Sequence, residues 1–314
     1  MTAPSSRAPR PWGYWTEVKL QILSDYLDAF LTACQSQREV VYLDAFAGEG
    51  HGLSRVTGKV ENEQLMAQSS TIEWTEATWN PVTGCDEVSP GCAHCYAKVF
   101  AERWRGVPGH PYAQGFDLRL WPERLEIPLR WRKPRTIFVN SMSDLFHEDI
   151  PLEFVDRIFA TMRAAPWHTF QILTKRHERL AELAGRFDWP PNVWMGVTIE
   201  NRRFVHRANA LRTVPAAVRF ISAEPLLGPL EGLDLTGIDW LIAGGESGHR
   251  HRRVDPDWIR GLRDACGREG VAFFFKQWGG HRPKSNGREL DGRHWDEYPQ
   301  PVQMHSPARV AATA

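Results

Sequence analysis

Short apolar runs alternate with amphipathic stretches over most of the chain after residue 70. The apolar runs are rich in β-branched and aromatic residues, which predicts strands. They lie at 136–140, 169–174, 193–199, 218–223, 239–244 and 271–275, with 71–75 as a further candidate. The stretches between them repeat apolar residues with a period of about 3.6, which predicts helices. They lie at 93–105, 151–164, 176–184, 202–212 and 255–268. Strands that alternate with helices predict an α/β protein with a parallel sheet.

Polar or charged residues follow each predicted strand. They include Asn140, Ser141, Ser143, Asp144, Lys175, Thr198, Glu200, Ser222, Glu224, Glu246 and Lys276. The carboxyl-terminal ends of parallel strands meet at one edge, where both barrels and doubly wound open sheets bind their ligands. Six or seven such units in series favour a barrel or partial barrel. We therefore expect one functional rim at the carboxyl-terminal ends of the strands.

Charge and hydropathy exclude some classes of protein. The 38 Lys and Arg residues balance 38 Asp and Glu residues, so no global positive field marks a nucleic-acid-binding protein. The N-terminus lacks the apolar core of a signal peptide, and no apolar run reaches the roughly 18 residues of a membrane span. We predict a cytoplasmic protein without a membrane segment, in which reduced thiols are free to bind metal.

Three of the five cysteines, Cys85, Cys92 and Cys95, fall within eleven residues rich in turn formers. Three thiolates can hold a four-iron cluster and leave one iron without a protein ligand, an open position for chemistry. Two alternatives stay open. One is a zinc site completed by His94 or by a distant histidine, and the other is a redox pair of Cys92 and Cys95. The other two cysteines lack spaced partners and are expected to be buried small residues.

Seven motifs between residues 66 and 280 are distinctive as a set. They are SSTIEWTEATWNPVTGC, VNSMSDLF, ILTKR, NVWMGVTIEN, ISAEPLLGP, LIAGGESG and FFFKQWGG. Together they resemble a phage-associated family of three-Cys-motif proteins. The loop from WNPVTGC to CAHCYA also resembles the cluster loop of radical S-adenosylmethionine enzymes. Its Cys-x6-Cys-x2-Cys spacing is longer than the commonest Cys-x3-Cys-x2-Cys spacing of that class.

The resemblance implies a partial (β/α)6 TIM-like barrel with a [4Fe-4S] cluster on the three cysteines and a bound S-adenosyl-L-methionine. In that class the cluster donates an electron that cleaves the cofactor and releases a 5′-deoxyadenosyl radical, which abstracts a hydrogen atom from the substrate. The electron is expected from a reductant such as flavodoxin or ferredoxin. The runner-up hypothesis is a non-catalytic, metal-stabilised nucleic-acid-binding protein of the phage type.

The same resemblance implies a set of cofactor-binding residues. His94 stands where the class often has an aromatic residue whose backbone contacts adenine. Ser141, Ser143 and Asp144 stand where the class has a Gly-Gly-Glu stretch for the methionine amine. Lys175 resembles the basic residue that pairs with the cofactor carboxylate in spore photoproduct lyase and its relatives. Thr198 and Glu200 are expected to contact the ribose of the cofactor. Glu224 is expected to contact its adenine or the substrate.

Two local basic clusters are candidates for binding a nucleic-acid or nucleotide substrate. Residues 130–135 read RWRKPR, and residues 249–253 read HRHRR. Arginine and tryptophan suit a phosphate backbone with stacked bases, although a solvated charged face is an equally good explanation. The second cluster follows Gly244, Gly245 and Glu246, which we expect to face the substrate. The lyase-like motifs favour nucleic acid.

Residues 1–65 are expected to form an N-terminal appendage, 66–300 the main domain and 301–314 a frayed tail. The appendage has an amphipathic helical pattern at 15–34, followed by VVYLDAFAGEG. This segment resembles the start of the three-Cys-motif partner proteins, which are methyltransferase-like, and the rest of such a domain is absent. The fusion of a truncated partner gene would explain the boundary near residue 65. A separate three-Cys-motif partner protein is a candidate binding partner of this chain. A third hypothesis is a methyltransferase built around Asp44, Gly48 and Gly50.

Overall fold

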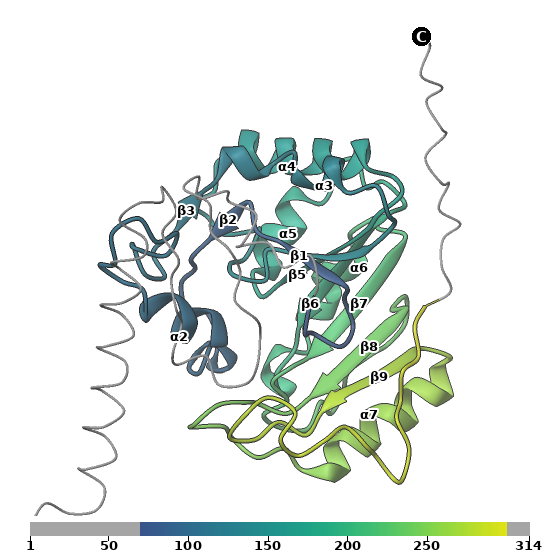
Figure 1. Cartoon of the computed structure of the whole chain (residues 1–314). Coiled ribbons are helices and arrows are strands. Elements are labelled where there is room, and N and C mark those ends of the chain that lie inside the picture. The colour runs from purple at the N-terminus through teal and green to yellow at the C-terminus, as the bar shows by residue number, and fades with distance from the viewer. Residues whose placement is uncertain (1–69, 300–314) are drawn as a thin grey trace, which may run out of the picture. The chain divides into compact units, whose positions relative to one another are not determined.

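The computed structural model describes residues 70–299, so the expected appendage and tail lie outside the described residues. Its centre is a parallel seven-stranded sheet whose strands are neighbours in chain order. The strands are β1 (Ala77–Trp79), β4 (Thr136–Val139), β5 (Thr169–Thr174), β6 (Val193–Thr198), β7 (Val218–Ala223), β8 (Trp240–Gly244) and β9 (Ala272–Gln277). The sheet curls between its edge strands β1 and β9 (Figure 1). The predicted partial TIM-like barrel is therefore confirmed, with seven strands.

The helices are α2 (Tyr96–Glu102), α3 (Ile127–Arg130), α4 (Leu152–Ala164), α5 (His177–Leu183), α6 (Arg207–Arg212) and α7 (Pro256–Glu269), with 3-10 turns η2 (Pro90–Cys92), η3 (Pro122–Arg124) and η4 (Arg202–Phe204). Helices α4 to α7 lie between strands of the sheet and cover its outer face, α2 lies apart from that face, and β7 runs into β8 without a helix (Figure 1). A small antiparallel pair, β2 (Val82–Thr83) and β3 (Arg119–Leu120), lies outside the main sheet. Within residues 70–299, none of the helices has the length and hydropathy needed to cross a bilayer.

Most predicted strands and helices agree with the structure to within two residues, and three differ. The candidate strand 71–75 is wrong: it forms a turn, and the strand follows at 77–79, where all three residues are buried. The predicted helix 93–105 begins only at Tyr96, because Cys95 has the non-helical ψ of 119° and occupies the N-cap position. The predicted helix 202–212 is divided into η4 and α6.

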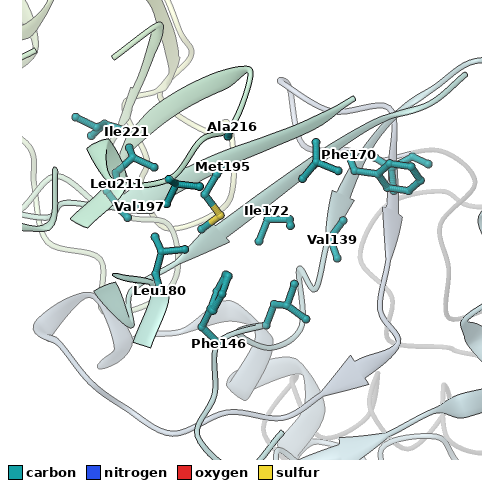
Figure 2. Close-up of a cluster of buried hydrophobic side chains, with 14 of the residues drawn as sticks. Val139, Phe146, Phe170, Ile172, Leu180, Met195, Val197, Leu211, Ala216 and Ile221 are labelled. Atoms are coloured by element: carbon teal, nitrogen blue, oxygen red, sulfur yellow. The ribbon is translucent and has the colours of Figure 1, made fainter. Parts of the chain in front are cut away.

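Alternate side chains of the strands form two apolar layers. The outer layer packs against the helices, as Figure 2 shows for Val139, Phe170, Ile172, Met195, Val197, Leu180 of α5 and Leu211 of α6. The inner layer is mostly aromatic and fills the bore of the partial barrel with Phe138, Trp194, Phe220, Trp240 and Phe274. These aromatic rings occupy the bore below the strand ends. The polar inner residues nearer the carboxyl-terminal ends therefore form the mouth of the bore.

Candidate metal centre at the carboxyl-terminal rim

The three cysteines lie on one loop, residues 85–96, which we call the cysteine loop. It follows β2 and runs into α2. The N–H of Gly84, just before it, donates to the carbonyl of Met142 at 2.9 Å. Gly84 has a φ of +89°, and a Cβ there would lie 2.2 Å from the carbonyl oxygen of Asp117. Only glycine fits such a conformation and approach, so this position fixes where the cysteine loop begins.

The cysteine loop lies over the carboxyl-terminal ends of several strands, as its contacts show. The Tyr96 hydroxyl donates to the carbonyl of Ser141, after β4, at 2.6 Å, and the sulfur of Cys85 lies 4.0 Å from Arg176, after β5. The Ser89 hydroxyl donates to Glu200, after β6, and His94 lies 3.0 Å from Glu246, after β8. Because these strands are parallel, the contacts all belong to one edge of the sheet. The thiols are therefore held at the rim where the sequence predicts the functional site.

The thiols are partly buried and lie in different surroundings. Burial and the nearby Asp144 carboxylate raise the pKa of Cys85 to about 12, although the Arg176 guanidinium opposes the shift. The Sγ of Cys92 lies 3.8 Å from the Ser89 hydroxyl. Without metal, Cys85 is therefore a neutral thiol. A metal ion would displace its proton, because coordination deprotonates a thiol.

The spacing of the sulfur atoms bears on which metal they fit. Around a tetrahedral zinc ion with Zn–S bonds of about 2.3 Å, ligand sulfurs stand about 3.8 Å apart. The Sγ atoms of Cys85, Cys92 and Cys95 do not all lie within 4.8 Å of one another. In a four-iron cluster each thiolate binds a different iron atom, which calls for more widely spaced ligands. Three thiols on one loop are the type of ligand that an iron–sulfur cluster takes, so this donor set is compatible with such a cluster.

A second group of ligand-type side chains lies beside the cysteine loop. Asp86, His147 and Asp149 bring one ligand atom each within 4.8 Å of the others. The buried His147 accepts the Asp149 N–H at Nδ1 (3.2 Å), and its Nε2 lies 3.2 Å from Oδ2 of Asp86. A metal-bound histidine donates its second ring N–H to an acceptor, whereas here the second nitrogen faces a backbone donor. We therefore read the group as a hydrogen-bonded tether for Asp86, the residue after Cys85.

Ser141 and Ser143, expected at the methionine amine, hold the loop after β4 in place. The Ser141 hydroxyl donates to Oδ1 of Asn80 at 3.2 Å, and the Ser143 hydroxyl donates to the Val82 carbonyl at 3.0 Å. The two acceptors are Asn80, directly after β1, and Val82, the first residue of β2. The loop after β4 is thus fastened beside the start of the cysteine loop.

Asp144, expected at the same amine, is buried and receives several hydrogen bonds. It accepts from the Thr174 hydroxyl at 2.7 Å and from the backbone N–H groups of Phe146 and Lys175 at 3.0 Å each. The ammonium of Lys175 then reaches inward and donates to the Thr198 hydroxyl at 3.4 Å. Asp144 therefore orders the ends of β4 and β5 and places Lys175 at the mouth of the bore.

Glu224 and Lys276 form an ion pair of 3.2 Å at the same mouth. The Glu224 side chain starts at the end of β7 and crosses β8 to reach Lys276 on β9. A Cβ on Gly244 of β8 would lie 2.5 Å from Oε1 of Glu224, so glycine leaves the room for this crossing. Burial raises the pKa of Glu224, while the Lys276 ammonium opposes the shift. The mouth thus holds paired charges above an aromatic floor.

Two buried carboxylates at the ends of β6 and β8 are each paired with an arginine. Glu200 is fully buried and accepts from Arg207 at 2.9 Å. Glu246 is 5% exposed and accepts from the backbone N–H and Nε of Arg252 at 2.8 Å each. Burial opposes ionisation of Glu246, but hydrogen bonds from Arg252 and His94 lower its pKa to about 2. Glu246 is therefore charged, and both carboxylates are already bonded within the protein.

Sequence reasoning misses three arginines at this site: Arg176, Arg207 and Arg252. Arg176 directly follows Lys175 in the motif ILTKR, and its place just after a strand is a signal that could have found it. Arg207 lies on α6, and Arg252 lies in a cluster that the sequence assigns to substrate or solvent. Their roles depend on contacts between segments far apart in the chain, which no local pattern reveals.

The two basic clusters lie at opposite ends of the sheet. Residues 130–135 precede β4 and so belong to the amino-terminal end, away from the cysteine loop. Residues 249–253 follow β8 on the rim, where the rings of His249 and His281 lie 4.1 Å apart and join the loops after β8 and β9. Only the second cluster shares the rim with the three thiols.

Solved structures of spore photoproduct lyase are similar to this chain. A complex with dinucleoside spore photoproduct is 14% identical, with a TM-score of 0.41 and a match over 62% of each chain. A mutant with bound AdoMet and dinucleoside spore photoproduct is 14% identical, with a TM-score of 0.40 over 62% of each chain. A cysteine-to-serine mutant is 14% identical, with a TM-score of 0.41 over 68% of this chain and 78% of the lyase. The match spans less than two thirds of the first two lyase chains.

No curated protein matches the chain. The model of one protein family matches residues 69–299, which is more than half of the chain. This region contains the whole sheet, the three cysteines of the loop and every rim residue described above. The chain therefore belongs to the family described as "Protein of unknown function (DUF5131)".

Proposed function

We propose that this protein is a radical S-adenosyl-L-methionine enzyme that holds a [4Fe-4S] cluster on Cys85, Cys92 and Cys95 and acts on nucleic acid or a nucleotide. One observation carries the proposal. The cysteine loop places three thiols over the carboxyl-terminal rim of a partial barrel, beside the polar mouth of its bore. Three protein ligands leave the fourth position of a cluster open toward a cofactor at that mouth.

The surroundings of the thiols support an anionic cluster. The Arg176 guanidinium lies 4.0 Å from the sulfur of Cys85 and opposes the burial and the Asp144 carboxylate that raise the pKa of this thiol. A cationic side chain at this place would balance the negative charge of a bound cluster. When bound, the cluster would supply the electron that cleaves the sulfonium of S-adenosyl-L-methionine and releases a 5′-deoxyadenosyl radical.

The mouth of the bore offers groups for the polar parts of this cofactor. Lys175 would pair with the carboxylate, which would replace its long contact with the Thr198 hydroxyl. The segment 141–144 would receive the amine on its oxygen atoms, and Glu224 would meet adenine or substrate. His94 and Glu200 would border adenine and ribose from the side of the cysteine loop. The aromatic floor excludes water from below, which protects a reactive radical.

The basic residues on the rim support a substrate with phosphate groups. Arg250 and Arg253 are exposed, and they lie on the loop that follows β8, next to Arg252. Arg252 itself contacts the cysteine loop at the carbonyl of Pro90, at 3.0 Å. A phosphodiester backbone bound here would lie against the edge that holds the thiols, as a substrate of this chemistry must.

Anaerobic reconstitution of the full-length protein with iron and sulfide tests the proposal. We expect about four irons per chain in the wild type. With dithionite and S-adenosyl-L-methionine, chromatography should then detect 5′-deoxyadenosine. Cys92→Ala should lose most of the iron and nearly all of this product. Cys266→Ala is the matched control, because Cys266 is buried in α7 and should leave both values unchanged.

Equally little 5′-deoxyadenosine from the wild type and from Cys92→Ala would defeat the proposal. If the chain instead binds zinc tightly and binds DNA or RNA without consuming the cofactor, it is the non-catalytic nucleic-acid-binding protein. Metal analysis and a gel-shift assay on the same preparation separate these outcomes.

A further inference from the structure

Glu246 fastens the cysteine loop to the end of β8. Its Oε2 lies 3.0 Å from Nδ1 of His94, and its carboxylate accepts several bonds from Arg252. The same arginine donates through Nη2 to the carbonyl of Pro90 at 3.0 Å. The pair of buried Glu246 and half-buried Arg252 therefore contacts the cysteine loop at residues 90 and 94, which lie on either side of Cys92.

Glu200 fastens the same loop from the end of β6. One of its oxygens accepts from Arg207 at 2.9 Å, and the other accepts from the Ser89 hydroxyl. Gly91 packs against this side chain, since a Cβ there would lie 2.6 Å from Oε1 of Glu200. Arg207 is anchored in turn on the carbonyl of Thr198 at 2.8 Å. This second buried ion pair therefore supports the loop at 89 and 91.

The turn that carries Cys92 has little stability of its own. It is the three-residue 3-10 helix η2, and no side chain caps its start. Short 3-10 turns have poor hydrogen-bond geometry and rarely hold a fixed shape alone. Contacts from outside the turn must therefore decide where the Cys92 thiol stands.

We propose that Glu200 and Glu246 are positioning residues that set the place of Cys92 over the rim. Each is buried and bonded to an arginine, so its rotamer is fixed, and each holds a neighbour of Cys92. Outer partners that are held in this way orient metal ligands and govern metal affinity. In this proposal Glu246 holds the cysteine loop, whereas the sequence predicts that it faces the substrate. The effect on a cluster rests on the proposed function, whereas the hold on the loop does not.

Alkylation of metal-free protein tests the hold on the loop. Reduced, chelator-treated, full-length protein is treated with iodoacetamide, and peptide mass spectrometry follows each cysteine separately. We expect Arg252→Met to raise the alkylation rate of Cys92 roughly tenfold, as the loss of a charge-assisted hydrogen bond would. Ser89→Ala should also raise it, because it removes the bond from Ser89 to Glu200, together with the contact between the same hydroxyl and the Cys92 sulfur, and leaves the pair with Arg207 intact. The double variant should multiply the two effects, since the supports are separate.

Arg186→Met is the matched control. It breaks an exposed pair with Asp156 (2.6 Å) far along the chain from the loop, and Cys92 should react as in the wild type. Arg252→Lys should recover part of the protection, because a lysine can reach Glu246 or Pro90 but not both. An unchanged Cys92 rate in the double variant overturns the proposal. So does an equal rise at Cys266, which would report general unfolding.

A second measurement addresses the cluster. After reconstitution, the electron paramagnetic resonance signal and midpoint potential of Arg252→Met should differ from those of the wild type, while Arg186→Met should match it. Matching spectra for all three proteins would overturn the effect on the cluster. A wild type that binds no iron contradicts the proposed function instead, and the alkylation rates still decide whether the two carboxylates hold Cys92.

Discussion

Gly196 shows how much one missing side chain decides in this fold. It lies in β6 in register with Phe220 of β7, and the Phe220 ring fills the bore beside it. A Cβ on Gly196 would lie 2.4 Å from Cε2 of that ring. Because the ring is buried among other aromatic rings, it has no free space to move into. The glycine is therefore part of how the bore is packed.

Gly196→Ala should lower the free energy of unfolding by about 1–3 kcal/mol, the usual cost of overpacking a core. Urea denaturation followed by tryptophan fluorescence measures this. Gly185→Ala is the control, because a Cβ at that exposed turn meets nothing within 4 Å. Equal stability of the two variants would show that the bore can repack around the added methyl group.

At the scale of elements, His168 joins α3 to the start of β4 and β5. It is fully buried, and its Nδ1 accepts the N–H of Arg135 at 3.1 Å. Its Nε2 lies 3.1 Å from the carbonyl of Pro128, so the neutral ring with a proton on Nε2 satisfies these two contacts. The Trp167 indole N–H, 3.0 Å from the same nitrogen, then donates to the Trp131 carbonyl at 2.8 Å. A second proton would have to sit on Nδ1 and would break the bond from Arg135. Burial accordingly lowers the pKa of His168.

This arrangement predicts a loss of stability in mild acid. The folded pKa of His168 lies below the unfolded value of about 6.5, so its contribution is complete above that pH and is lost as the pH falls below it. The wild type should unfold at lower urea concentration at pH 5.5 than at pH 7.5. In His168→Gln this difference should shrink, whereas His294→Gln, at an exposed site, should keep it. An identical pH dependence in all three proteins would contradict the assignment.

At the scale of the described domain, the parallel sheet separates two basic clusters that look equivalent in the sequence. Residues 130–135 lie at the amino-terminal end of β4, and residues 249–253 lie at the carboxyl-terminal end of β8. The three thiols lie at the carboxyl-terminal end of the sheet, as does the cluster at 249–253. A substrate that must reach the thiols can therefore use only the second cluster.

This separation predicts which arginines bind nucleic acid. Arg250→Met and Arg253→Met should each weaken binding to single-stranded DNA or RNA and reduce the slope of log affinity against log salt by about 0.7. Arg132→Met removes the same charge from the other end and should change neither value. Fluorescence anisotropy at several salt concentrations measures both. A larger effect from Arg132 would place the nucleic acid at the wrong end for the proposed chemistry.

Much of the fold could be predicted because periodicity is a local property. The strands 169–174 and 218–223 have the predicted bounds, and Asp255 caps α7 by accepting the Asp257 N–H at 2.9 Å, as its cap-Pro-acid opening predicts. The segment 71–75 failed because its β-like composition does not reveal that the chain turns before it joins the sheet. The roles of single residues were harder to predict. The sequence predicts that Glu246 faces the substrate, and its bonding to Arg252 and His94 arises only in three dimensions.

The sequence alone determined the parallel α/β architecture, the edge of the sheet at which polar residues gather and the three candidate thiol ligands. It could do so because these features depend on residues that are close together in the chain. They are the periods of strands and helices, the polar residues at strand ends and the spacing of the cysteines. Only the tertiary structure decided that the cysteine loop crosses the rim from β4 to β8 and that two Glu–Arg pairs contact it on both sides of Cys92. Those contacts join residues more than a hundred positions apart, such as Ser89 with Glu200 and His94 with Glu246. Their partners are selected by the order of strands in the curled sheet, which brings distant loops together at one edge.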